Sequence, residues 1–98
     1  MTVPKTVKIM GITYEICQVD KLMDHNQVKL NGNIDYSNSK ISIDSELSDQ
    51  IKIVTIWHEV IHGLLSQANI EHDEKLVEFL GYGITGFLAD NSEMRGNK

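Results

Sequence analysis

The chain of 98 residues has few of the features that mark secreted, fibrous or membrane-spanning proteins. Its single cysteine, Cys17, cannot form an internal disulfide, so the chain is not a disulfide-stabilised secreted domain. One proline and seven glycines exclude a collagen-like or low-complexity chain. The longest uncharged stretch, Phe79 to Ala89, has eleven residues, whereas a membrane-spanning helix needs about 18 or more. Lys5 and Lys8 interrupt the N-terminal segment, which is not typical of a signal peptide. We therefore expect a cytoplasmic protein with no membrane partner.

Positive charge is also scarce. Nine Lys and Arg residues stand against fourteen Asp and Glu residues, which gives a formal net charge of −5. An acidic domain without a basic cluster repels a phosphate backbone, so we expect no nucleic-acid partner. Hydrophobic residues make up 41% of the chain and charged residues 23%, as in ordinary globular proteins. The length suits one domain over residues 1–98, and the polar composition of residues 91–98 predicts a disordered tail.

Alternating apolar and polar residues predict strands in the first half of the chain. Residues 7–10 and 12–19 are rich in β-branched side chains and are separated by Gly11. Asn31-Gly32 is typical of a turn. Beyond it, residues 34–36 and 40–43 are separated by three polar residues, as in a hairpin. These segments predict a small, mostly antiparallel sheet of three or four strands, with residues 40–43 at its exposed edge.

Apolar residues at helical spacing predict two helices in the second half. The first is expected to begin after Asp44 or Ser45, with Ser48 as a later N-cap, and to run to about Ser66. The second is expected to begin after Asp73, a good N-cap residue. The sequence therefore predicts an α+β fold in which the sheet is followed by two packed helices.

The second predicted helix contains three glycines, Gly81, Gly83 and Gly86. Each lowers the stability of a helix by up to about 1 kcal/mol relative to alanine. Glycine clusters of this kind are typical of close approach to another backbone. We therefore expect this helix to pack tightly.

Residues 58–62 read His58-Glu59-Val60-Ile61-His62, the H-E-x-x-H pattern, inside the first predicted helix. His62 lies about 40° from His58 around a helix and one turn further along, so both imidazoles can hold one ion. Zn²⁺ suits such a pair because it binds neutral imidazole nitrogen. Glu59 lies about 60° further round from His62. Its carboxylate is thus placed to act as a general base on water without ligating the metal.

A catalytic zinc site typically has three protein ligands and one open position. The second predicted helix offers Glu74 and Glu78, one turn apart and beside its apolar face. We favour Glu74 as the third ligand because it is nearest the connection to the histidines, and Glu78 is the alternative. Asp73 and His72 are further options, although Asp73 fits better as a cap. The glutamate that does not ligate could hydrogen-bond a histidine ligand.

These residues carry a resemblance to a known family. The motif, the following acidic segment that begins at Asp73, and the hairpin segments of residues 32–36 and 40–44 resemble small zinc metallopeptidase-like proteins of phages and prophages. These proteins are relatives of the ImmA/IrrE group of HExxH peptidases. The likeness covers residues 30–91. It implies a minimal zincin-like core, with zinc held by His58, His62 and a downstream Glu, and Glu59 as general base.

The resemblance also implies a protein or peptide substrate, with a regulatory protein as one option. Unlike the better-known branch, this chain has no helix-turn-helix segment, and the candidate glutamates follow His62 by only 12 or 16 residues. The sequence thus predicts a zinc-dependent peptidase that hydrolyses a peptide bond through metal-activated water. The alternatives are a non-catalytic zinc protein and a metal-free interaction module. The sequence leaves the oligomeric state open.

Overall fold

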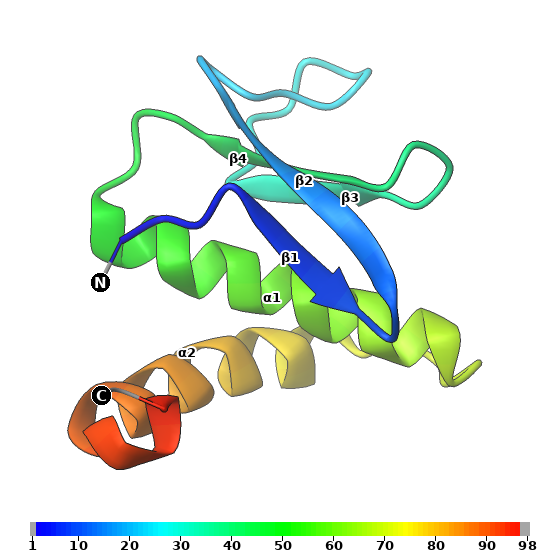
Figure 1. Cartoon of the computed structure of the whole chain (residues 1–98). Coiled ribbons are helices and arrows are strands. Elements are labelled where there is room, and N and C mark those ends of the chain that lie inside the picture. The colour runs from blue at the N-terminus through cyan, green and yellow to red at the C-terminus, as the bar shows by residue number, and fades with distance from the viewer. Residues whose placement is uncertain (1, 97–98) are drawn as a thin grey trace.

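Four strands and two long helices follow one another in the computed structural model, which describes residues 2–96 (Figure 1). The elements are β1 (Thr6–Ile9), β2 (Ile12–Val19), β3 (Gly32–Asp35), β4 (Lys40–Asp44), α1 (Asp49–Gln67), α2 (Glu74–Asp90) and the 3₁₀ helix η1 (Ser92–Arg95). The predicted α+β class and the order of sheet before helices are confirmed. No helix among the described residues is long and apolar enough to cross a membrane.

The sheet has the strand order β1-β2-β4-β3. The β1–β2 and β3–β4 pairs are antiparallel, as predicted, whereas β2 and β4 pair in parallel at the centre. The polar segment between β2 and β3 leads the chain to the outer edge of the sheet before it returns in β4. β3 is therefore an edge strand, and the expectation that residues 40–43 form the exposed edge is wrong. The physical reason is that β4 pairs with a strand on each side, so its Ile41 and Ile43 are completely buried in the core between the sheet and α1.

Helix α1 starts later than the first two proposed caps would place it. Its N-cap is Ser48, whose hydroxyl accepts a hydrogen bond from the backbone N–H of Ile51 at 3.3 Å. Asp44 instead ends β4 fully buried and accepts a hydrogen bond from the N–H of Glu46. The hydroxyl of Ser45 is directed to the carboxylate of Asp20. Both side chains thus have partners other than the N–H groups at the start of α1.

Helix α1 lies between two layers (Figure 1). The sheet covers one side of it and contributes to a core of Ile9, Tyr14, Ile41, Ile43 and Ile56. α2 covers the other side, and α1 and η1 are the only described elements that α2 contacts. As a result, only Val77, Gly81 and Thr85 of α2 are buried. The prediction of two packed helices is confirmed, but their contact is a narrow stripe.

The three glycines of α2 behave differently from one another. A Cβ atom at Gly81 would lie 3.5 Å from the carbonyl oxygen of Val54, so this glycine makes the close backbone approach that the sequence predicts. Gly83 and Gly86 have nothing within 4 Å of that position. For these two residues, no neighbour in the described chain explains the absence of a side chain.

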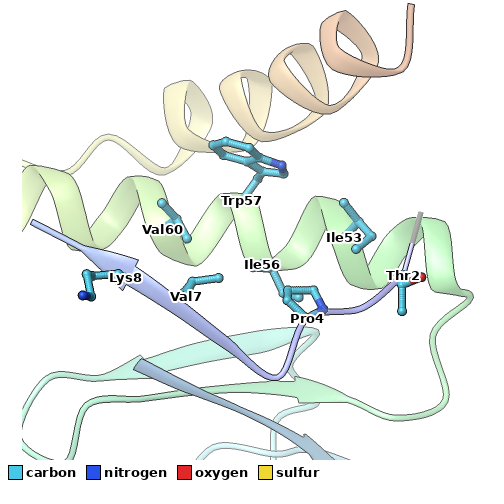
Figure 2. Close-up of a pocket in the computed structure, with 8 residues that line it drawn as sticks. All are labelled: Thr2, Pro4, Val7, Lys8, Ile53, Ile56, Trp57 and Val60. Carbon is cyan, nitrogen blue, oxygen red and sulfur yellow. The ribbon is translucent and has the colours of Figure 1, made fainter. Parts of the chain in front are cut away.

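An apolar pocket of about 380 Å³ lies where the N-terminal segment and β1 cross α1 (Figure 2). The pocket is lined by Val7, Ile53, Ile56 and Val60, and by the half-buried Trp57. The only charged side chain in its lining is Lys8. This pocket is suited to apolar contact and holds no group that could ligate a metal or act as a base at neutral pH.

The expectation of a disordered tail over residues 91–98 stays a prediction, and the described part of this segment continues from α2. Within residues 91–96, η1 forms a short helical turn, and the side-chain amide of Asn91 donates a hydrogen bond to the carbonyl oxygen of Phe87. Gly96 closes that turn with a positive φ of 68°. Residues 97–98 of the predicted tail lie outside the described residues.

Gly32 is the glycine with the least space. A Cβ atom there would lie 2.5 Å from Thr55 Cγ2 and 3.0 Å from the carbonyl oxygen of Ser42. We expect Gly32→Ala to lower the free energy of unfolding by about 1–3 kcal/mol because Thr55 is buried and its hydroxyl is bonded to the helix backbone. Urea unfolding of dilute protein measures the change. As a matched control, Gly83→Ala should raise that free energy by up to about 1 kcal/mol. Equal effects of the two substitutions would contradict this packing.

Candidate metal centre and cleft

Helix α1 places both histidines of the H-E-x-x-H motif on one side of its surface. Their ring centroids are 5.0 Å apart, and their side chains are 18% (His58) and 14% (His62) exposed. Glu59 is turned further into the protein and is 6% exposed as a residue. The helical spacing of the motif brings the two imidazoles together, as the sequence predicts, and the burial of the Glu59 carboxylate is a property of the fold.

The connection between the helices brings Glu74 to the histidines. Asn69 takes a left-handed conformation at the end of α1, with φ of 56°, and the chain reverses. The carboxylate of Asp73 then accepts hydrogen bonds from the N–H groups of Lys75 and Leu76, at 3.0 and 3.2 Å, so Asp73 is the N-cap as expected. Glu74 follows as the first residue of α2, directly beside the histidines on α1.

The carboxylate of Glu74 meets both imidazoles. Its Oε1 lies 3.5 Å from His58 Nε2 and 2.5 Å from His62 Nε2. One potential ligand atom from each of the three residues lies within 4.8 Å of the others, and no other such cluster of His, Cys, Asp or Glu occurs in residues 2–96. The structure therefore brings together the three residues that the sequence favours as ligands.

The alternative ligands occupy other positions. Glu78 lines the adjacent cleft but is not part of the cluster. Asp73 is engaged in capping α2. His72 lies behind His62, where the two rings stack with centroids 4.9 Å apart. His25 is exposed in the segment between β2 and β3 and is not part of the cluster.

His62 is held from the side opposite Glu74. Its Nδ1 lies 2.7 Å from His72 Nδ1, and His72 Nε2 lies 3.2 Å from the hydroxyl of Ser66. When Nε2 of His62 ligates a metal, Nδ1 carries the proton and donates it to His72. Hydrogen bonds of this kind fix the orientation of a ligand histidine. The hydroxyl of Tyr36 also donates to the backbone carbonyl of His62 at 3.3 Å, which ties the β3–β4 turn to this part of α1.

Glu59 lies in a cleft of about 330 Å³ between α1, the start of α2 and the chain leading into β3. His58, Glu74 and Glu78 share this cleft, and Lys29 is its only cationic lining residue. Burial, and to a smaller extent the negative charge of Glu74, raises the pKa of Glu59 from 4.5 to about 7. A carboxylate with a pKa near neutrality can both accept and release a proton under ordinary conditions.

The donor set fits a zinc ion. Two imidazole nitrogens and one carboxylate oxygen are ligands that Zn²⁺ takes in catalytic sites, which leave a fourth position open. Zinc with bonds of about 2.0–2.1 Å holds its ligand atoms roughly 3.3–3.5 Å apart. The distance of 3.5 Å between His58 Nε2 and Glu74 Oε1 matches this spacing. The shorter contact to His62 can lengthen because the side chain of Glu74 is 69% exposed.

Comparison of the chain with protein-family models, with curated proteins and with solved structures found no match.

Two residues near the site, Gly32 and Tyr36, make contacts that the sequence patterns do not indicate. Gly32, interpreted as part of a turn, starts β3, and a Cβ atom there would lie 3.5 Å from Glu59 Oε2. Tyr36, to which the sequence patterns assign no part in the site, donates a hydrogen bond to the backbone carbonyl of His62. No local sequence pattern predicts either contact, because each joins segments more than 25 residues apart.

The raised pKa of Glu59 predicts a pH-dependent stability in metal-free protein. Because the folded form holds the proton more tightly, folding is progressively disfavoured as the pH rises from about 4.5 to about 7, and the penalty is then constant. A variant that cannot ionise, Glu59→Gln, should be more stable than the wild type at pH 8 by on the order of 2 kcal/mol. The difference should shrink towards pH 5. Denaturant unfolding with a chelator present measures it.

Glu78→Gln is the matched control for this measurement, because Glu78 lines the same cleft but is exposed. We expect it to change the pH dependence much less. If Glu59→Gln were less stable than the wild type at pH 8, the buried carboxylate would not carry the penalty.

Proposed function

We propose that this protein is a zinc-dependent peptidase. The observation that carries the proposal is the convergence of His58, His62 and Glu74 beside the buried carboxylate of Glu59. Three ligands with an open position, next to a base that is not a ligand, are the parts that metal-assisted hydrolysis needs. A purely structural metal site has no use for the buried Glu59, whose ionisation is unfavourable in this setting.

In this proposal a Zn²⁺ ion held by the two histidines and Glu74 would supply Lewis acidity for a carbonyl oxygen and for water. Glu59 acts as the general base. It accepts the proton of the attacking water, and it then delivers that proton to the nitrogen of the leaving amine. His72 orients His62 through the Nδ1 contact, and Ser66 in turn supports His72.

The substrate is proposed to be an extended segment of a protein or peptide. β3 is an edge strand, and its first residue, Gly32, lines the cleft together with Asn31. An extended chain can add to such an edge through backbone hydrogen bonds, as many peptide-binding domains allow. Bound in this way, it would pass the mouth of the cleft that holds Glu59. A regulatory protein in the cytoplasm is one substrate that the resemblance suggests.

A second candidate is a zinc site that serves stability alone. α2 contacts only α1 and η1 among the described elements and buries three residues. A metal shared by Glu74 of α2 and the histidines of α1 would fasten this weakly covered helix. Small domains commonly gain stability in this way.

Metal content tests the ligand set. We expect purified protein to bind about one zinc ion per chain, and His58→Ala, His62→Ala and Glu74→Ala each to weaken binding by at least tenfold. Glu78→Ala should bind zinc as the wild type does. Removal of zinc by a chelator should lower the melting temperature, because a ligand that binds only the folded form stabilises it. Wild-type protein that binds no zinc under metal-replete conditions would eliminate both candidates.

Glu59→Gln separates the two candidates. We expect this variant to retain zinc and to lose about 10²–10⁴-fold in the rate of peptide cleavage. A proteome-derived peptide library, with the products identified by mass spectrometry, is the assay. Equal cleavage by the variant and the wild type would remove Glu59 from the mechanism. Zinc-loaded wild-type protein that cleaves nothing in the library would favour the structural role.

A further inference from the structure

The side of α2 that faces away from α1 is unusually apolar. Around the helix, this side contains seven residues, which we call the outer face of α2: Lys75, Leu76, Phe79, Gly83, Gly86, Phe87 and Asp90. Leu76 is 52% exposed, Phe79 is 70% exposed and Phe87 is 51% exposed. In Figure 1 this side of α2 is turned away from the sheet and from α1. A helix that is apolar on both sides is normally covered on both sides.

The exposed area approaches what a stable interface needs. An aromatic side chain offers about 150–250 Å² of surface, so the exposed parts of Phe79, Phe87 and the neighbouring Tyr82 amount to roughly 250–450 Å². Specific interfaces bury about 800 Å² per partner, of which a little over half is apolar. The outer face of α2, together with Tyr82 beside it, therefore supplies more than half of the apolar part of such an interface.

We propose that the outer face of α2 binds the same face of a second copy of this chain, with the two α2 helices antiparallel about a two-fold axis. An interface of this kind must be complementary to itself. If one residue of the first copy contacts another residue of the second copy, the same two residues also meet with the copies exchanged. The charges at the two ends of the face meet this condition. Lys75 lies in the first turn and Asp90 at the last residue, so an antiparallel pair sets each lysine against the aspartate of the other copy.

The steric profile fits the same register. When Lys75 is opposite Asp90, the axis passes between Tyr82 and Gly83, and Phe79 of each copy lies opposite Gly86 of the other. Gly86 has nothing within 4 Å of its missing Cβ, so it leaves a hollow for the exposed ring. Gly83, equally open, lets the two backbones approach at the axis. Within one chain these two glycines have no packing role. In the pair of helices, both glycines have a packing role.

The substitution Gly86→Gln tests the hollow. Because the position is open in a single chain, glutamine should leave the fold intact and raise its stability through better helix propensity. In the pair of helices, the same side chain fills the place of the partner's Phe79. We expect wild-type protein to sediment as a dimer in the micromolar range, and Gly86→Gln to weaken dimerisation at least tenfold. A merely structural role for Gly86 would not lower association while raising stability.

The charge pair tests the register. Lys75→Asp should weaken dimerisation about tenfold, because it sets two like charges against each other at each end of the interface. Asp90→Lys should do the same, and the double variant Lys75→Asp/Asp90→Lys should restore the wild-type dimer. Both changes suit the helix dipole, so unfolding of α2 would not explain the losses. Lys21→Asp, outside this face, makes the same change in charge and should leave dimerisation unaltered.

Wild-type protein that sediments as a monomer at every concentration up to the highest micromolar range would overturn the proposal. So would a dimer that is insensitive to Gly86→Gln, since another surface would then form it. A dimer that loses strength in each single charge variant and does not recover in the double variant would overturn the antiparallel register. None of these outcomes bears on zinc binding or on peptide cleavage.

Discussion

The contact between Glu74 and the two histidines joins α2 to α1 at the candidate metal site. α1 by itself can present only two imidazoles, whereas a catalytic zinc needs a third ligand. In the proposed site that ligand comes from α2, which packs against α1 through the narrow stripe of Val77, Gly81 and Thr85. The distances of 3.5 and 2.5 Å from Glu74 Oε1 to the two Nε2 atoms therefore link the arrangement of the helices to the chemistry of the site. The packing of α2 on α1 therefore determines whether the proposed metal site has its third ligand.

Glu59 shows how the fold gives two residues of one type different properties. Glu74, 69% exposed in its side chain, remains available to bind a cation. Glu59 is enclosed by α1 and by the start of β3, and this burial raises its pKa to about 7. Ionisation of a buried acid is unfavourable, and this penalty persists because the surrounding strand and helix hold the side chain in place. The fold thus places a buried carboxylate with a raised pKa next to the cluster of His58, His62 and Glu74.

The parts of the fold that could be predicted are those determined by neighbouring residues. The H-E-x-x-H motif fixes the relation of His58 to His62 through helical geometry alone, and Asp73 marks the start of α2 by its capping chemistry. Choosing Glu74 over Glu78 required only the assumption that the helices meet near their connection. The order of the strands in the sheet could not be predicted in the same way. The parallel pairing of β2 with β4 depends on the path of the chain between them and not on any local pattern.

Contacts between distant segments account for the remaining differences. The contact of Gly32 with Thr55 and the hydrogen bond from Tyr36 to the backbone of His62 form only once the sheet lies on α1. The glycines of α2 correctly indicated close approach at Gly81. Gly83 and Gly86 have no such neighbour within one chain, and in the proposed dimer their neighbour is the second copy. A composition that is locally unfavourable for a helix can thus point to a neighbour that one chain does not contain.

The connection of residues 68–73 has a consequence for how the chain could be rearranged. It is short, it begins at the left-handed Asn69 and it ends at the cap Asp73, so it determines where Glu74 lies relative to His62. New chain termini placed in this connection, as in a circular permutation, would release Glu74 from that position. The longer polar excursion between β2 and β3 is the better place to open the chain, because most of it lies far from the histidines. We therefore expect the positions of the proposed metal ligands, more than the hydrophobic core, to determine where circular permutation is tolerated.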